Sequence, residues 1–225
     1  MAPLVSLRLA MFDCDGTLVD SQHTIFAAVR AAFESCGVAP PEPAQARAVI
    51  GLPLAEAMAA LVPPDAAFDS RLLAARYKEA FAAARARPDF AEPLFPGALA
   101  ALAALAADGY LLGVATGKGR RGLETTLGRH GLLDRFATIQ TSDSGPGKPH
   151  PAMLLRAIAE TGVEPACCVM IGDTTFDVRM ARAARAKALG VAWGYHGVDE
   201  LAAAGAQAIV ESFAELPAAV RELLP

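Results

Sequence analysis

Apolar runs alternate with helical stretches from Leu94 onward, and this alternation constrains the fold more than any other feature of the sequence. The apolar runs have the length of buried strands and lie at residues 110–115, 137–141, 167–171, 189–193 and 208–210. The stretches with helical spacing lie at residues 98–108, 121–130, 151–161, 176–186 and 213–224. Strands connected by helices imply right-handed crossovers and a parallel sheet. With a further apolar run at residues 7–12, the sequence predicts a doubly wound, Rossmann-like α/β core that binds ligands beyond the carboxyl ends of its strands.

Residues 20–90 differ from the rest of the chain. Residues 21–36 carry a helical apolar stripe, with Ser21 as the expected N-cap and Gly37 at its end. Helical spacing and prolines continue through the remainder, without any strand-like alternation. We therefore expect a core formed by residues 1–19 and 91–225 and an inserted all-helical cap domain formed by residues 20–90.

Composition and charge exclude several classes of protein. The 225 residues are 54% hydrophobic and 20% charged, as in globular proteins. A net charge of −4 without a basic stripe argues against nucleic acid as a partner. There is no secretory signal, and the longest run of small apolar residues is about half a membrane span, so we expect no membrane partner. The spacings of Cys14, Cys36, Cys167 and Cys168 match neither a zinc site nor a redox pair, which predicts reduced thiols in a cytoplasmic protein. We expect a monomer or a homodimer.

Two pairs of aspartates follow two of the predicted strands. Asp13 and Asp15 lie on one side of an extended segment, and Gly16 allows the chain to turn after them. Asp173 and Asp177 are four residues apart and share one face of the first turns of a helix. Carboxylates gathered at the end of a sheet repel one another unless a cation or a proton compensates them. Oxygen ligands of this kind favour Mg²⁺ over zinc.

Two further groups of residues in predicted loops could bind an anion. Thr116 and Gly117 end a strand and begin a helix with Lys118, an arrangement suited either to anion binding or to ordinary helix capping. Lys148 lies between Gly147 and Pro149, which constrain the backbone around it and can hold its charge in place.

Taken in order, these motifs resemble those of the haloacid dehalogenase-like hydrolase superfamily. The resemblance covers nearly the whole chain, and the helical insert is similar to the cap of the subgroup that contains phosphoglycolate phosphatases. It implies a phosphatase in which Asp13 is the nucleophile that attacks phosphorus, and Asp15 protonates the leaving oxygen and then takes a proton from water. The motifs that carry the resemblance are Asp13-x-Asp15-Gly16-Thr17, Thr116, Lys148 and Gly172-Asp173-x-x-x-Asp177.

The resemblance also implies a magnesium site and a phosphate site. Mg²⁺ would be bound by Asp13, Asp173 and the backbone carbonyl of Asp15. Asp177 would either bind the ion directly or contact the residues that bind it. Thr116 and Lys148 would hold the phosphate oxygens. Four carboxylates and a phosphate dianion carry −6, whereas Mg²⁺ and Lys148 return only +3. The remaining negative charge would be compensated by a proton on Asp15 and by backbone N–H groups near Gly16, Thr17 and Gly117.

The substrate is expected to be a small phosphorylated metabolite similar to phosphoglycolate. Candidate contacts from the cap are Gln22 and Arg47. Arg47 could bind a substrate carboxylate with two hydrogen bonds, although the sequence favours a solvated helical side chain. The rival activities are those of a sugar phosphomutase, a pyrophosphatase and a nucleotidase, and the rival from another class is a phosphate-binding partner protein without turnover. Dehalogenases of the superfamily lack an acid at the position of Asp15, and its mutases carry a basic residue where Leu52 follows Gly51. Similar family members also have a glycine at the end of the last motif's helix, where this chain has residues 184–187 without one.

Overall fold

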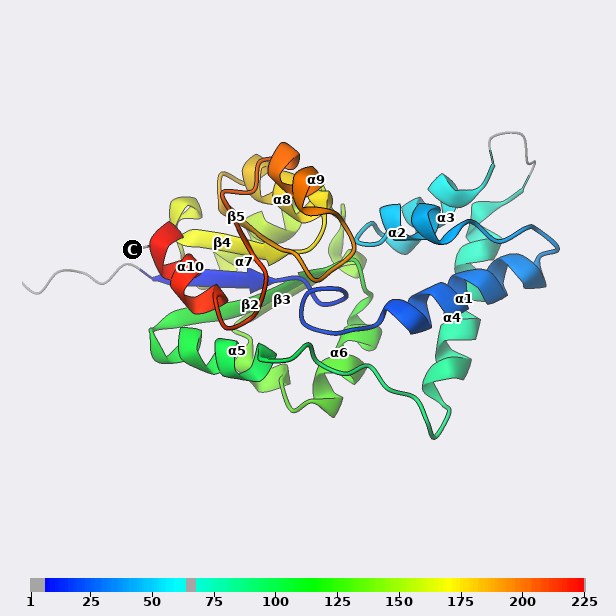
Figure 1. Cartoon of the computed structure of the whole chain (residues 1–225), viewed down its shortest axis with the longest axis horizontal. Coiled ribbons are helices and arrows are strands. Elements are labelled where there is room, and N and C mark those ends of the chain that lie inside the picture. The colour runs from blue at the N-terminus through cyan, green and yellow to red at the C-terminus, as the bar shows by residue number, and fades with distance from the viewer. Residues whose placement is uncertain (1–6, 64–67, 225) are drawn as a thin grey trace, which may run out of the picture.

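A computed structural model describes residues 7–63 and 68–224, and these residues form a parallel sheet flanked by helices (Figure 1). The sheet has six strands in the order β3-β2-β1-β4-β5-β6. This order places β1 at the centre, between β2 and β4, as in a doubly wound fold. The strands are β1 (Arg8–Phe12), β2 (Tyr110–Thr116), β3 (Thr138–Thr141), β4 (Cys168–Gly172), β5 (Lys187–Val191) and β6 (Ala208–Val210). The predicted Rossmann-like α/β core is confirmed.

The register of β1 aligns the carboxyl ends of the three central strands. Phe12 pairs with Val114 of β2 and with Ile171 of β4. The backbone N–H of Asp13 continues the pairing by donating to the carbonyl of Ile171 at 2.9 Å. Residues that follow these strands therefore meet at one edge of the sheet.

Helices cover both faces of the sheet, and strand alternation divides the core between them. Ala10 and Phe12 face the layer of α5 (Ala98–Ala107), α6 (Arg120–Arg129) and α10 (Leu216–Leu223). Leu9 and Met11 face the layer of α7 (Ala152–Thr161), α8 (Thr175–Ala183) and α9 (Val198–Ala204). Short 3-10 helices occur at Leu133–Arg135, Ser142–Ser144 and Pro165–Cys167.

Four helices follow β1 and lie beyond the carboxyl ends of the strands (Figure 1). They pack around an apolar cluster that includes Phe33, Met58 and Leu73. Residues 20–63 and 68–90 contain no strand. The four helices, called the cap helices below, are α1 (Gln22–Ser35), α2 (Pro43–Ala48), α3 (Leu54–Leu61) and α4 (Ser70–Arg85). The division into a core of residues 1–19 and 91–225 and a cap of residues 20–90 stays a prediction, and residues 1–6, 64–67 and 225 of those ranges lie outside the described residues.

Two local expectations were wrong, and one helix was not predicted. The helix expected to reach residue 186 ends at Ala183, and Arg185 adopts the left-handed conformation (φ 60°) in which glycine is usual. The next strand therefore occupies Lys187–Val191 instead of residues 189–193. Helix α9 was not expected, because its seven residues are too few for a helical period to stand out from the sequence. Ser21 is the N-cap residue of α1, as expected, although its side chain makes no capping hydrogen bond.

Two further sequence expectations concern the cysteines and the membrane. All four cysteines are free thiols. Within residues 7–63 and 68–224, no helix combines the length and apolar character needed to cross a bilayer.

Candidate active site

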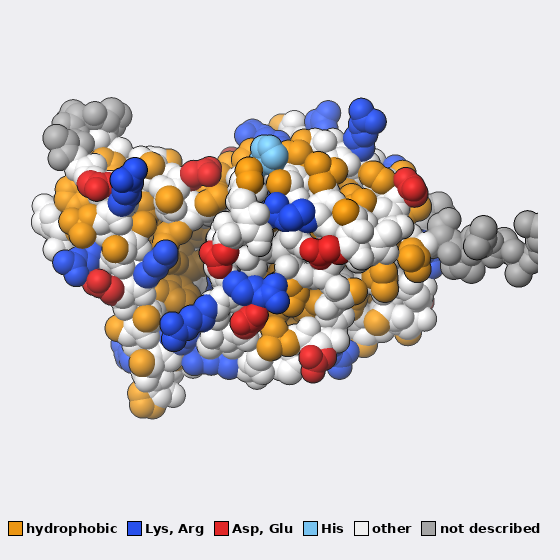
Figure 2. Space-filling view, turned by 180° about the vertical axis from the view of Figure 1, so that it is seen from behind, with side chains coloured by type: hydrophobic (Ala, Val, Ile, Leu, Met, Phe, Trp, Pro, Cys, Tyr) orange, Lys and Arg blue, Asp and Glu red, His pale blue; other side chains and the backbone are white. Residues whose placement is uncertain are grey.

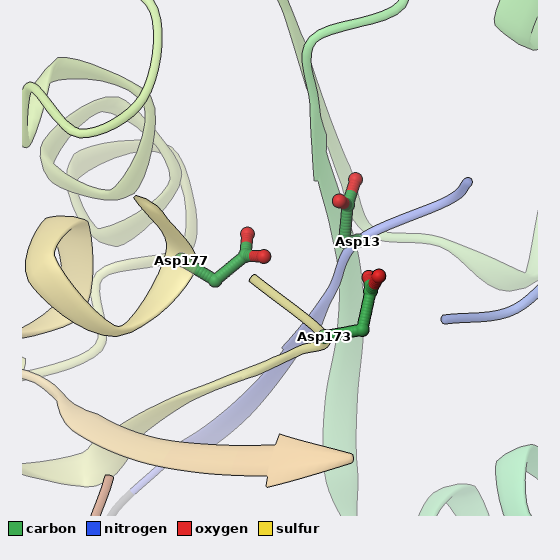
Figure 3. Close-up of side chains that lie close together, drawn as sticks. All are labelled: Asp13, Asp173 and Asp177. Atoms are coloured by element: carbon green, nitrogen blue, oxygen red, sulfur yellow. The ribbon is translucent and has the colours of Figure 1, made fainter. Parts of the chain in front are cut away.

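Three buried aspartates converge at the carboxyl edge of the sheet (Figure 3). Asp13 follows β1, Asp173 follows β4, and Asp177 lies in the first turn of α8. Each offers one carboxylate oxygen, and these oxygens lie within 4.8 Å of one another. Three hard oxygen donors at such separations suit a divalent cation such as Mg²⁺. The family resemblance implies that these aspartates share one metal site, and the structure brings their side chains together.

The burial of these carboxylates makes their negative charge costly. Burial raises the pKa of Asp13 to about 7, although the ammonium group of Lys148 lowers it. Burial also raises the pKa of Asp173 well above its usual value, and the charges of Asp13 and Asp177 add to the shift. Protons or a cation therefore stabilise the cluster, and a bound divalent ion would compete with the protons.

Lys148 supplies one positive charge at the centre of the cluster. Its Nζ atom is fully buried and lies 2.9 Å from Asp13 Oδ2 and 2.6 Å from Asp177 Oδ1. Burial lowers the pKa of Lys148, but the two carboxylates more than offset this, so the pKa lies above its usual value. Lys148 thus stays charged and links the nucleophile expected from the sequence to the first turn of α8.

Asp173 is held in place by groups from distant parts of the chain. The Thr17 hydroxyl donates to Asp173 Oδ1 at 2.7 Å, and the backbone N–H of Tyr195 donates to Oδ2 at 2.9 Å. Gly16 passes very close to the same carboxylate, with φ at +81°, and a Cβ atom there would lie 2.3 Å from Asp173 Oδ2. The turn after β1 therefore requires glycine for both its conformation and its contact.

Asp177 is oriented by a capping box at the start of α8. Its Oδ2 atom accepts hydrogen bonds from the backbone N–H of Thr174 at 3.1 Å and from the Thr174 hydroxyl at 2.6 Å. These bonds satisfy groups that a helix start leaves unpaired, and they leave Oδ1 facing Lys148. Asp177 is therefore both a helix cap and a member of the carboxylate cluster.

Asp15 lies apart from the three carboxylates and takes part in a second charged network. Its Oδ1 atom accepts from the Ser21 hydroxyl at 2.6 Å and forms an ion pair with Lys118 Nζ at 3.0 Å. Lys118 also pairs with Glu92 at 3.2 Å, and Glu92 pairs with Arg85, at the end of α4, at 3.3 Å. This network of Asp15, Lys118, Glu92 and Arg85 joins the first motif to the last cap helix.

A cavity of about 1080 Å³ separates the sheet edge from the cap helices. Figure 2 shows the hollow, with hydrophobic side chains inside it and lysines and arginines around it. Asp13, Asp15, Thr116 and Gly117 line the cavity, whereas Asp173 and Asp177 do not. Asp13 therefore belongs both to the carboxylate cluster and to the cavity wall.

The cap closes on the sheet edge through the turn between α2 and α3. A Cβ atom on Gly117 would lie 2.9 Å from the carbonyl oxygens of Gly51 and of Leu52. The absence of a side chain at residue 117 thus allows the cap backbone to approach the loop after β2.

The remaining residues proposed for substrate binding from the sequence lie in different places. Thr116 is buried at the end of β2, whereas Thr17 directs its hydroxyl to Asp173. Gln22 and Arg47 do not line the cavity, and Arg47 is exposed on α2. A substrate contact from either of these two side chains stays a prediction.

Several residues of the site were not identified from the sequence. Ser21, Glu92 and Tyr195 approach the motifs only through tertiary folding, and no local pattern marks them. Lys118 is different, because it directly follows Thr116-Gly117, and its place in that cluster was a usable signal. Its ion pair with Asp15, however, depends on the packing of β1 beside β2.

Comparisons with known proteins agree with this geometry. The sequence matches the family of haloacid dehalogenase-like hydrolases over residues 10–191. The probable phosphatase IndB of Dickeya dadantii (strain 3937) is 36% identical over 217 residues, which cover 96% of this chain and 94% of that protein. A phosphoglycolate phosphatase of Rhodospirillum rubrum is 33% identical over 216 residues, or 93% of this chain and 89% of that protein. A solved structure described as a predicted phosphatase from Clostridium acetobutylicum has a TM-score of 0.84 at 25% identity and covers 96% of this chain and 99% of its own.

Proposed function

Because the chain belongs to the haloacid dehalogenase-like hydrolases and is a phosphatase of that family, we propose that it hydrolyses phosphomonoesters with Mg²⁺ through an aspartyl-phosphate intermediate. The proposed substrate is a small phosphorylated metabolite, the class to which phosphoglycolate belongs. The proposed location is the cytoplasm, which the four free cysteines support.

This proposal rests on the position of Asp13 between the acidic cluster and the cavity. Its carboxylate lies within the buried acidic cluster and also forms part of the cavity wall. A nucleophile needs such a position, because it must face the substrate while its own charge is held and oriented from behind. Lys148, 2.9 Å away, supplies that orientation.

The proposed reaction has two steps. In the first, a carboxylate oxygen of Asp13 forms a bond to phosphorus, the bond from phosphorus to the leaving oxygen breaks, and Asp15 gives its proton to that oxygen. In the second, Asp15 takes a proton from water, the water oxygen attacks phosphorus, and the bond to Asp13 breaks to release phosphate. Asp15 suits the acid–base role because it also lines the cavity, two residues after Asp13 in the same motif.

The charges of the site fit a divalent cation. Five carboxylates, namely four aspartates and Glu92, face three cations, namely Lys118, Lys148 and Arg85, which leaves a net −2. Asp13, Asp173 and Asp177 have the oxygen chemistry that holds Mg²⁺. When bound, the ion neutralises charge near the phosphoryl oxygens. Thr116 and Lys148 are proposed to hold those oxygens, together with the backbone N–H groups near Gly117.

The experiment is an assay of phosphate release from p-nitrophenyl phosphate by the purified protein. We expect release with Mg²⁺ and none with excess chelator. Asp13→Asn should abolish release and keep the wild-type circular dichroism, whereas the exposed control Asp199→Asn should retain full activity. Undiminished release by Asp13→Asn would refute the nucleophile assignment. Conversion of glucose 1-phosphate to an isomer without free phosphate would replace hydrolysis by a mutase reaction.

A further inference from the structure

The cap wall of the cavity is mostly apolar, with the charged side chains of Lys78, Glu79 and Arg85 contributed by α4. It is formed by residues of all four cap helices and of the turn between α2 and α3, and it extends the hydrophobic cluster of the cap. Its side chains include those of Val29, Ile50, Leu52, Met58, Tyr77 and Phe81. The cavity volume of about 1080 Å³ far exceeds what a two-carbon leaving group would fill.

A chain of contacts places an aromatic pair of this wall near the expected acid. Lys118 Nζ lies 3.0 Å from Asp15 Oδ1 and 5.4 Å from the centre of the Phe81 ring. The Phe81 and Tyr77 rings pack against each other with their centres 5.7 Å apart. In the proposed mechanism the leaving group accepts its proton from Asp15, which would place the part of the substrate beyond the leaving oxygen on the side of these rings.

The cations near Asp15 do not form a free site for a second anion. Lys118 is shared between Asp15 and Glu92, and Arg85 pairs with the same Glu92. The other cations in the wall, Lys78 and Arg121, are exposed side chains, so water screens them. A carboxylate on the leaving group would therefore lose its hydration without gaining a new buried partner.

We propose that the preferred substrate carries an apolar or aromatic ring on its leaving group, and that the ring binds in the cap wall against Phe81, Tyr77 and Leu52. This inference rests on the proposed phosphatase activity and narrows its substrate class. Phosphoglycolate, which has a carboxylate and no ring, is then a poor substrate. Charged side chains of α4 also line this side of the cavity, so the surface proposed to receive the ring is limited to Phe81, Tyr77 and Leu52.

The test compares 2-phenylethyl phosphate with ethyl phosphate. Both release a primary alcohol of similar acidity, so their ratio of kcat/KM reports binding of the ring and not leaving-group chemistry. We expect the wild type to prefer the phenylethyl ester by about tenfold or more, the gain for burying one phenyl ring. Phe81→Ala should bring the ratio close to one. Phe26→Ala removes a ring from α1 that does not line the cavity, and it should keep the wild-type ratio.

The outcomes separate this inference from the proposed function. A wild-type ratio near one, or a higher kcat/KM for phosphoglycolate than for 2-phenylethyl phosphate, would overturn the ring preference. Turnover of ethyl phosphate that depends on Mg²⁺ and Asp13 would at the same time leave the phosphatase activity standing. Leu52→Ser is a second variant in case Phe81→Ala does not fold, and a lowered ratio for it supports the same conclusion, whereas an unchanged ratio contradicts it.

Discussion

Replacing Lys148 by methionine tests the electrostatics of the site most severely. The Lys148 ammonium group is fully buried and contacts Asp13 at 2.9 Å and Asp177 at 2.6 Å. Methionine fills similar space but leaves both carboxylates without this cation. Removing one partner of a buried ion pair costs about 3–5 kcal/mol. A typical domain has a free energy of unfolding of about 5–15 kcal/mol, so Lys148→Met should still fold but with much of its stability lost.

The loss should depend on pH, because Asp13 can take up a proton. Burial raises the pKa of Asp13 from 3.8 in the unfolded chain to about 7 in the folded protein. The stability that Asp13 contributes is therefore fully present below pH 3.8 and is lost as the pH rises through about 7. Without Lys148 the pKa of Asp13 rises further, which deepens the loss above neutral pH. Lys148 itself stays charged throughout this range, since its own pKa is raised. The free energy of unfolding of Lys148→Met should therefore fall more at about pH 8 than at about pH 5.

The assay is urea unfolding of metal-free protein, followed by circular dichroism at both pH values. Lys78→Met is the matched control, because the exposed Lys78 has no ion pair to a described residue and should change stability by less than about 0.5 kcal/mol. A loss below about 1 kcal/mol at the higher pH, or an equal loss at both, would refute the idea that Lys148 compensates the carboxylates.

Three further predictions concern the acid and the metal. Asp15→Asn should lose far more kcat on ethyl phosphate than on p-nitrophenyl phosphate, because nitrophenolate leaves without a proton; equal losses in steady-state assays would contradict the acid role. The apparent affinity for Mg²⁺, measured by calorimetry, should increase as the pH rises toward about 7, because protons on Asp13 compete with the metal; an affinity independent of pH would contradict this. Thr17→Val removes the hydroxyl that orients Asp173 at 2.7 Å and should weaken Mg²⁺ binding about 10- to 100-fold, with unchanged binding as the contrary result.

The sequence allowed the core to be predicted because its signals are local. Each strand of the sheet is a short apolar run next to a helix, and the carboxyl ends of such strands meet at one edge. Asp13, Asp173 and Asp177 directly follow strands or begin a helix, so their meeting could be expected from position alone. The predicted end of α8 was wrong because the usual signal for a helix end is a glycine in the left-handed conformation, and here Arg185 adopts that conformation instead.

The contacts around Asp15 could not be predicted, because they depend on packing between distant segments. Glu92 reaches Lys118 only when the segment after α4 lies beside the loop after β2. Phe81 has the spacing of an ordinary core residue, and its place in the cavity wall follows from the orientation of α4. Periodicity identifies the apolar face of a helix but not the surface that this face meets.

Calorimetric titration of Mg²⁺ into the wild type and into Asp173→Asn tests most directly whether the three carboxylates share one ion. We predict one binding site on the wild type and no measurable binding to Asp173→Asn. Asp15→Asn should bind Mg²⁺ like the wild type, because its carboxylate pairs with Ser21 and Lys118 outside the cluster. Binding of Mg²⁺ to Asp173→Asn with the wild-type affinity and stoichiometry would contradict the shared site.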